Sequence, residues 1–320
     1  MKRKLLRCLL RNRVTRAVLN VAYNMLSYQK RADFIGYADV FSIGEIINRR
    51  ELYSFWRVEF MGNLIRMPMS NWPQALTIAA YDPEIVEFYE WVITDRMVDV
   101  FVDIGANCGT HSFLFASQGI RAIAVEPNHW CARFIGSVCE HNNFWFMKPE
   151  ILEFAVGDKA EITFLFFPPE KSWLGIVGEN REKAFEHKIA SDPSCPKLKR
   201  DDPMTREQVR LIRLDDSELF RYGRPKKTLL KIDVEGMEFE VLSGGITFIA
   251  TFRPIILFEC FDSQVNRECI YRLLGSLNYR IFPLPFNPLV CFSEESRFVT
   301  SAGTNFVACP NDRNFTSKVL

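Results

Sequence analysis

Three acidic residues lie at or just beyond the ends of consecutive strands that the sequence predicts. Asp103 and Glu126 lie near the ends of the first two strands, and Asp158 follows the third. Ligands of open α/β sheets bind beyond the carboxyl ends of the strands, where an acid accepts hydrogen bonds from ribose hydroxyls or an amino group. One such acid is weak evidence because it is often a helix cap. Three in this order predict a site for a nucleoside cofactor.

A glycine-containing bend directly after the first strand predicts which cofactor binds. Its spacing is Gly105-x-x-x-Gly109, whereas dinucleotide-binding proteins carry G-x-G-x-x-G and place a pyrophosphate at the helix N-terminus. The Asp103 carboxylate would repel a pyrophosphate, but it suits the amino group and positive sulfonium of S-adenosylmethionine (SAM). The predicted SAM-binding residues are Asp103, Gly105, Asn107, Gly109, Glu126 and Asp158. An NAD(P)-dependent oxidoreductase is the main alternative.

A second group of reactive side chains lies at the end of the predicted fourth strand. Methyl transfer from a sulfonium is an in-line displacement, so the protein aligns an acceptor lone pair and removes a proton when the acceptor is an alcohol. Asp233 is the first candidate for the general base, and His111 is an alternative. Lys231 could polarise the alcohol. Glu235 could orient the acceptor, raise the carboxyl pKa of its neighbour or help to bind a divalent ion.

Simpler interpretations of these residues stay open. Glu235 could cap a helix, Glu259 could pair with Lys231, and His111 could be an ordinary polar helix residue. No Asp/Asn-Pro-Pro-aromatic motif, which would indicate an amine acceptor, follows the fourth strand. The sequence therefore favours O-methylation.

The elements that must position these residues are short strands alternating with helices. From residue 98 onward, β-branched and aromatic runs alternate with helix-like segments, which is the pattern of βαβ units. We place strands at residues 98–104, 121–126, 151–156, 227–233, 254–260, 279–283 and 305–309, with added edge strands at 161–167 and 209–214. Helices are expected from Pro83 and over residues 111–118. The predicted fold is α/β and Rossmann-like, with a seven-stranded, mostly parallel sheet and helices on both faces.

An N-terminal extension, residues 1–81, is predicted ahead of a main domain at residues 82–320. Residues 2–31 hold nine basic and no acidic residues, interleaved with leucines and valines, as in a basic amphipathic helix. Such a helix could bind a membrane surface or a partner, act as a mitochondrial-type presequence, or pack plainly on the body. A β-hairpin with a turn at Gly62-Asn63 is predicted to follow.

A polar insertion near residues 168–208 interrupts the main domain. It holds five prolines and little apolar periodicity. A segment of this length without a core signal is either functional or disordered. We expect either a mobile flap over the acceptor site or a disordered segment.

Composition excludes several classes of protein. The chain has 40 basic and 39 acidic residues, so no overall field favours nucleic acid as a partner. No uncharged apolar run approaches the ~20 residues that span a bilayer, and we expect a cytoplasmic protein that can contact a membrane peripherally. Nine cysteines without a CxxC pair and four histidines without HExxH spacing predict reduced thiols and no zinc site. No metal ligand set is assigned.

Several motifs together resemble the FkbM-type methyltransferases. The most telling is Lys231-Ile232-Asp233-Val234-Glu235-Gly236, and the others are Val102-Asp103-Ile104-Gly105-Ala106-Asn107-Cys108-Gly109, Val125-Glu126-Pro127-Asn128, His141-Asn142-Asn143, Ala155-Val156-Gly157-Asp158 and Arg213-Leu214-Asp215-Asp216. The resemblance implies a class I Rossmann-like methyltransferase that uses SAM to methylate a hydroxyl of a sugar, glycan or secondary metabolite. The segment Cys108-Gly109-Thr110-His111 and the basic N-terminal helix depart from the family pattern. A non-catalytic Rossmann-like module with a membrane- or partner-binding helix is a further alternative.

Overall fold

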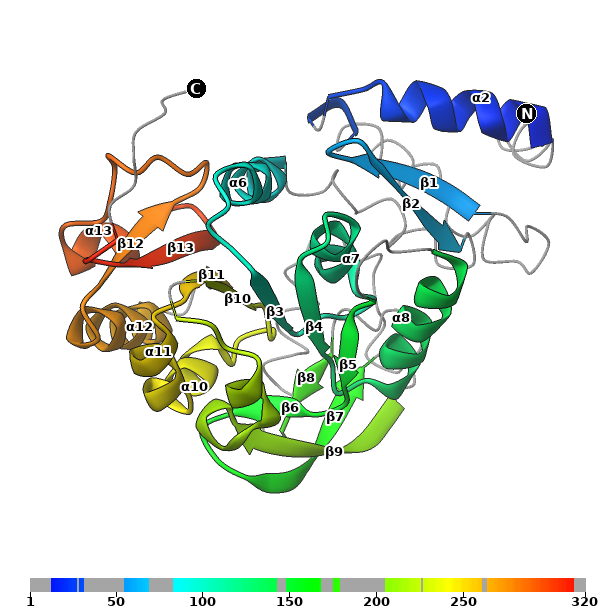
Figure 1. The fold of residues 1–320 in the computed structure, drawn as a ribbon. Coiled ribbons are helices and arrows are strands. Elements are labelled where there is room, and N and C mark those ends of the chain that lie inside the picture. The colour runs from blue at the N-terminus through cyan, green and yellow to red at the C-terminus, as the bar shows by residue number, and fades with distance from the viewer. Residues whose placement is uncertain are drawn as a thin grey trace.

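The computed structural model describes residues 13–27, 29–31, 55–68, 83–142, 148–167, 175–178, 205–225, 227–260 and 264–313. Within these residues a mixed seven-stranded sheet forms the centre of the molecule (Figure 1). A four-stranded sheet and a two-stranded hairpin are separate from it. The chain therefore has an α/β fold with one central sheet.

The central sheet has the strand order β12-β13-β11-β10-β3-β4-β5. Its strands are β3 (Val100–Ile104), β4 (Arg121–Val125), β5 (Glu150–Leu152), β10 (Thr228–Ile232), β11 (Ile255–Glu259), β12 (Tyr279–Pro283) and β13 (Asn305–Pro310). Four of the six pairings are parallel, and β13 is antiparallel to both of its neighbours. The chain moves outward from β3 to β5 and then continues from β10 on the other side. A topological switch point thus lies between β3 and β10.

Alternate residues of the strands face two hydrophobic cores, one on each side of the sheet. Phe101 and Leu229 belong to the first core, and Val102 and Leu230 belong to the second. The first core is covered by α6 (Pro83–Thr94), α7 (Thr110–Ser117) and α8 (His129–His141), and the second by α10 (Glu238–Ser243), α11 (Ile246–Phe252), α12 (Gln264–Ser276), α13 (Glu295–Val299) and the 3₁₀ turns η4 (Leu214–Asp216) and η5 (Glu218–Arg221). Because both faces are buried, the strands are largely apolar, as the sequence indicated, and the charged Asp103 and Lys231 stand out within β3 and β10.

The predicted third strand, residues 151–156, is split between two sheets. Its first part is β5 in the central sheet, and after Phe154 the chain enters β6 (Ala155–Gly157) in the second sheet. The other strands of this second sheet are β7 (Glu161–Phe167), β8 (Ile176–Val177) and β9 (Thr205–Arg213), in the order β6-β9-β7-β8. The two runs predicted as edge strands therefore belong here, which corrects that prediction. The local apolar pattern could not predict that the strand divides between two sheets, because the division depends on Ala155 pairing with Leu211, which lies far along the chain.

The polar insertion near residues 168–208 joins strands of this second sheet. Only residues 175–178 and 205–208 of it belong to the described part of the chain. The predicted flap therefore lies almost wholly outside the described residues.

The predicted hairpin is confirmed as β1 (Phe55–Phe60) and β2 (Asn63–Pro68). Phe60 pairs with Asn63, so the turn residues are Met61 and Gly62, one position earlier than predicted. Both have positive φ, 46° and 81°, as a two-residue type I′ turn requires. The buried hairpin side chains belong to the same core as α7 and α8.

Helix α2 (Arg13–Asn24) lies on the hairpin and forms part of the predicted basic amphipathic helix. Residues 1–12 of that prediction lie outside the described residues. Among the helices described, none is long and apolar enough to cross a membrane.

Candidate active site

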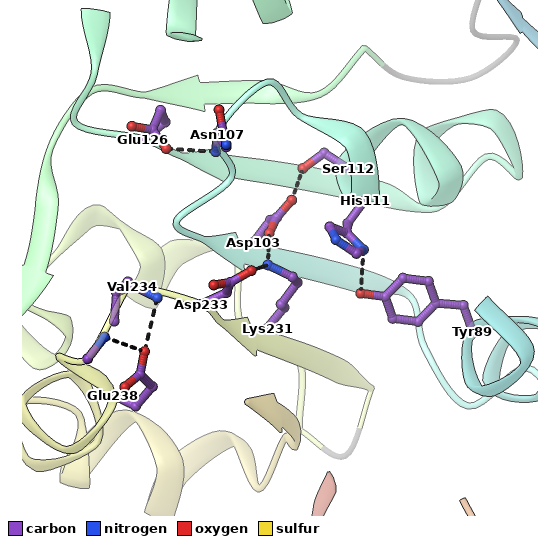
Figure 2. Close-up of polar contacts among 11 residues, drawn as sticks. Tyr89, Asp103, Asn107, His111, Ser112, Glu126, Lys231, Asp233, Val234 and Glu238 are labelled. Atoms are coloured by element: carbon purple, nitrogen blue, oxygen red, sulfur yellow. Dashed lines mark hydrogen bonds and ion pairs between the residues drawn. The ribbon is translucent and has the colours of Figure 1, made fainter. Parts of the chain in front are cut away.

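A buried lysine joins two carboxylates at the switch point between β3 and β10. Lys231 lies opposite Asp103 in the parallel ladder. Its Nζ donates a hydrogen bond to Asp233 Oδ2 at 3.0 Å and lies 3.5 Å from Asp103 Oδ1 (Figure 2). Lys231 and Asp233 are two residues apart at a strand end, so their side chains leave the chain on the same side. The sequence motif thereby brings a fixed positive and a fixed negative charge together.

Ion pairing outweighs burial in setting the charges of this pair. Burial lowers the pKa of Lys231, but Asp233 and Asp103 raise it above its usual range. Burial raises the pKa of Asp233, but the Lys231 ammonium and a hydrogen bond to Glu259 bring it down to about 2. Both groups are therefore ionised at neutral pH.

Asp103 is fully buried and holds the Lys231 side of this pair. Its Oδ2 accepts a hydrogen bond from Ser112 Oγ at 2.8 Å, on the first turn of α7. Its Oδ1 has the Lys231 ion pair and no hydrogen bond within the described residues. Asp103 thus connects β3, β10 and α7. Its contact with a cofactor stays a prediction.

His111 lies beside the ion pair and is oriented by a buried tyrosine. His111 Nδ1 and Tyr89 Oη are 3.0 Å apart, and Tyr89 is fully buried on α6 (Figure 2). Burial, with help from the nearby Lys231 charge, lowers the pKa of His111 to about 4, so its imidazole is neutral at neutral pH. Sequence reasoning missed Tyr89 as a site residue because it occupies an apolar helix stripe. A tyrosine there was itself a signal, since a buried hydroxyl needs a partner.

These side chains line one small pocket. Its lining comes from α6, α7, β10, β11 and β13 and from the residue after β10, namely Ile85, His111, Lys231, Ile232, Asp233, Leu257, Glu259 and Asn305. Glu259 and Asn305 lie opposite each other at the ends of β11 and β13. The structure therefore brings together three of the four side chains predicted for the chemistry, His111, Lys231 and Asp233, and places Glu259 beside them. The fourth, Glu235, is not among the residues that line this pocket. The structure adds Asn305, which no motif marked.

The glycines of the bend after β3 make room for the protein's own chain. Gly105 has a φ of 79°, and a Cβ there would lie 1.8 Å from the backbone oxygen of Asp233. Gly109, at the start of α7, has a φ of 76°, and its Cβ would lie 2.8 Å from Ile135 Cγ1. At Gly105, therefore, the absence of a Cβ lets the loop after β10 cross closely. Ligand contact at both glycines stays a prediction.

Glu126 follows β4 and fixes the same bend. Its Oε2 accepts from the Asn107 amide at 2.7 Å and its Oε1 from the Asn128 amide at 2.8 Å. Burial raises the pKa of Glu126 to about 7 despite these hydrogen bonds. Asn107 itself has a left-handed φ of 48°. In Figure 2 the Glu126–Asn107 pair and the His111–Tyr89 pair lie on opposite sides of Asp103.

The turn after β10 places a third carboxylate near Asp233. Glu235 and Gly236 have φ values of 57° and 100°. The turn is held by Glu238, which was not predicted: its Oε1 accepts from the amides of Val234 at 3.2 Å and Gly236 at 3.1 Å. Helix α10 begins after Met237 without a side-chain cap, so Glu235 does not cap it.

Three carboxylates at this edge could hold a divalent cation. One oxygen each of Asp233, Glu235 and Glu259 lie within 4.8 Å of one another. The sequence had marked Glu235 for such a role but had assigned no ligand set. Carboxylate oxygens are suitable ligands for Mg²⁺ or Ca²⁺.

Asp158 is separated from the other predicted residues by the split of the third strand. It follows β6 in the second sheet, is exposed, and lies where Gly244 packs against the backbone of Gly157 and Asp158. It therefore does not stand at the third strand end of the central sheet. Its contact with a cofactor stays a prediction.

Comparison with known families identifies the chain. The Methyltransferase FkbM domain matches residues 103–281, more than half of its length. The chain belongs to the FkbM methyltransferase family. A solved FkbM methyltransferase from Methylobacillus flagellatus KT is similar at 12% identity with a TM-score of 0.39, covering 75% of this chain. This chain spans about half, 54%, of that structure's chain, and no curated protein matches.

The FkbM match covers most of the pocket but not all of it. Asp103, His111, Lys231 and Asp233 lie inside residues 103–281. Tyr89 and Asn305 lie outside, on α6 and β13. Two elements beyond the matched stretch, α6 and β13, therefore contribute to the candidate site.

Proposed function

We propose that this FkbM methyltransferase transfers a methyl group from SAM to a hydroxyl of a sugar, glycan or secondary metabolite. The observation that carries the proposal is an ionised Asp233, held by Lys231, in the same pocket as a neutral His111. The pocket lies at the switch point where open α/β sheets bind ligands. The strand order and the reversed β13 support a class I Rossmann-like arrangement.

The acidic strand ends fit a cationic nucleoside cofactor. Glu126, Asp103 and Asp233 belong to or follow β4, β3 and β10, which lie side by side. Each Glu126 oxygen accepts one backbone hydrogen bond, which leaves a lone pair for a ribose hydroxyl. Among the described residues that line the pocket, Lys231 carries the only permanent positive charge, and two carboxylates neutralise it. This balance favours a sulfonium over a pyrophosphate.

The pocket residues can align a hydroxyl and take its proton. When bound, SAM supplies an electrophilic methyl carbon on a positively charged sulfur. Asp233 accepts a hydrogen bond from the acceptor hydroxyl and orients its lone pair. A His111 tautomer that donates Nδ1–H to Tyr89 keeps a lone pair on Nε2 for the proton.

The ion pair reverses the order of the two candidate bases. The Lys231 ammonium lies 3.0 Å from Asp233 Oδ2 and lowers the pKa of Asp233, so this carboxylate is a poor proton acceptor, whereas the neutral His111 ring has a nitrogen lone pair for the proton. A weak base is sufficient because the hydroxyl becomes strongly acidic as its oxygen is methylated. We assign proton removal to His111 and orientation to Asp233.

Calorimetry with SAM and its demethylated product tests the cofactor assignment. We expect binding to the wild-type chain and an affinity about 10- to 100-fold lower for Glu126→Ala, the range for losing hydrogen bonds to a charged group. Glu126→Gln separates the lost charge from the lost loop contacts. Glu161→Ala, an exposed carboxylate paired with Lys159, is the matched control. Unchanged affinity in both Glu126 variants would refute the ribose assignment, and thermal protection by NAD(P) but not SAM would favour an oxidoreductase.

Labelled SAM offered to fractionated glycans and small metabolites tests the acceptor assignment. The expected product carries an O-methyl group, which mass spectrometry and NMR distinguish from N-methyl. His111→Gln should lower kcat more than Asp233→Asn does at the same pH. The reverse order would return the base role to Asp233.

A further inference from the structure

Helix α2 turns an apolar face away from the protein. Val14, Val18, Val21 and Met25, the last just past the helix end, are 71%, 62%, 61% and 82% exposed. Their spacing of four, three and four residues places them on one side of a helix. A surface helix of a globular protein normally shows the opposite polarity.

Polar contacts hold the helix in this orientation. Asn24 Nδ2 donates to the Arg57 carbonyl at 2.9 Å, and Asn24 Oδ1 accepts from the Glu59 amide at 3.0 Å. Asn20 Oδ1 accepts from the Arg57 amide at 3.3 Å. These bonds satisfy the edge of β1, while Tyr23 is buried beside them. The helix therefore cannot roll to bury its apolar face without losing them.

The hairpin separates α2 from the central sheet. Figure 1 shows α2 at the rim of the molecule, with β1 and β2 between it and α7. Contacts join α2 to β1 and β2 to α7. The exposed face thus lies far from the switch point, and no residue of the pocket contributes to it.

The charge of this part of the chain selects the occupant. Residues 1–32 contain nine lysines and arginines and no acid. Arg31 is buried and donates hydrogen bonds to the carbonyls of Asn24 and Glu59. The segment therefore has a strong positive charge even when Arg31 is left out. Two copies of so basic a segment repel each other, whereas anionic lipid headgroups attract it. Apolar residues flanked by lysine and arginine are the pattern of helices that lie in a bilayer interface.

We propose that the face of α2 formed by Val14, Val18, Val21 and Met25 inserts into the interface of an anionic lipid bilayer. The positive charge of residues 1–31 would supply the attraction to the headgroups. The helix lies in the plane of the membrane and does not span it. This docking is independent of the methyl-transfer proposal.

Co-sedimentation of the full chain with vesicles tests the docking. The probes are phosphatidylcholine vesicles with and without about 30% phosphatidylserine. Phosphatidylserine is an anionic lipid that gives the vesicle surface a negative potential. We expect strong binding to the anionic vesicles, weak binding to the neutral ones, and a clear decrease at high salt. The double variant Val18→Glu/Met25→Glu should bind anionic vesicles at least about tenfold less, because charges on the buried face must be desolvated.

The matched control is Val265→Glu on α12, where the valine is 68% exposed on another face of the molecule. It should bind vesicles like the wild type. An unchanged thermal unfolding temperature in all variants would show that the substitutions altered binding and not folding. If the double variant does not fold, Val21→Asn replaces it in the same vesicle assay. Equal binding by the double variant and wild type would overturn the proposal. A different result would also overturn it: the wild type binds no vesicles but forms a dimer in light scattering, and the double variant does not dimerise. That result would identify a second copy of the chain as the occupant of the face.

Discussion

Removing the buried ammonium of Lys231 should destabilise the fold strongly. Lys231→Met keeps the length and apolar stem of the side chain but leaves Asp103 and Asp233 without their shared counter-charge. Breaking a buried ion pair on one side lowers the free energy of unfolding by about 3–5 kcal/mol. Lys159→Met removes an exposed lysine that pairs with Glu161 at 3.0 Å. That control should change stability by less than about 1 kcal/mol.

The effect of Lys231→Met has a defined pH dependence. The folded pKa of Asp233, about 2, lies below its ordinary 3.8, so this group stabilises the fold above pH 4 and loses that contribution as the pH falls toward 2. The folded pKa of Lys231 is raised, so its contribution is complete below its ordinary pKa of 10.5. The difference between wild type and variant should therefore be full at pH 7 and smaller at pH 3.

Urea unfolding monitored by circular dichroism measures these differences at pH 7 and pH 3. A double variant Asp103→Asn/Lys231→Met should recover part of the loss, because it removes one of the two uncompensated carboxylates. A Lys231→Met variant within about 1 kcal/mol of wild type at pH 7 would refute the reasoning. Strict additivity of the two substitutions would refute the coupling between the two residues.

Three further predictions concern the same region. Gly105→Ala should lower the free energy of unfolding by about 3 kcal/mol or more, because its Cβ overlaps a backbone oxygen and its φ is positive. Gly136→Ala on α8 should instead raise the free energy of unfolding in the same urea assay, because its Cβ would lie 4.0 Å from the nearest atom, Ile151 Cδ1. The wild-type free energy of unfolding should fall by on the order of 3 kcal/mol as the pH rises from 4.5 to about 7, because folded Glu126 keeps a proton that the unfolded chain has released. Glu126→Gln should flatten this dependence of stability on pH, and an unchanged dependence would contradict the inference that burial raises the pKa of Glu126. Tyr89→Phe should lower kcat about tenfold and shift the pH profile of kcat, with KM little changed, because the His111 ring loses its hydrogen bond to the tyrosine hydroxyl. An unaltered pH profile would show that the Tyr89–His111 contact is only structural.

The central sheet and the position of the site could be predicted from the sequence because both rest on local signals. Strands buried on both faces are largely apolar runs, and Asp233 directly follows the last residue of β10. The motif spacing of Lys231 and Asp233 fixes their shared side by strand geometry alone. These features required no knowledge of distant neighbours.

The remaining features depend on contacts between distant segments. The split after Leu152 is decided by pairing of β6 with β9, and no local pattern records that pairing. Tyr89 reaches His111 only because α6 and α7 cover the same face of the sheet. The relative pKa values of His111 and Asp233 depend on burial and on a lysine placed by the fold. Sequence therefore indicated which residues meet but not how their protons are distributed.

The position of β13 has a consequence for how the protein is made. This last described strand lies between β11 and β12, and within the described residues it is the only strand that β12 pairs with. A ribosome delivers β11 and β12 well before residues 305–310, so the nascent sheet has an open edge between them. Open apolar edges are prone to misassembly. Because β13 also supplies Asn305 to the pocket, closure of the sheet and completion of the pocket both wait for the same strand.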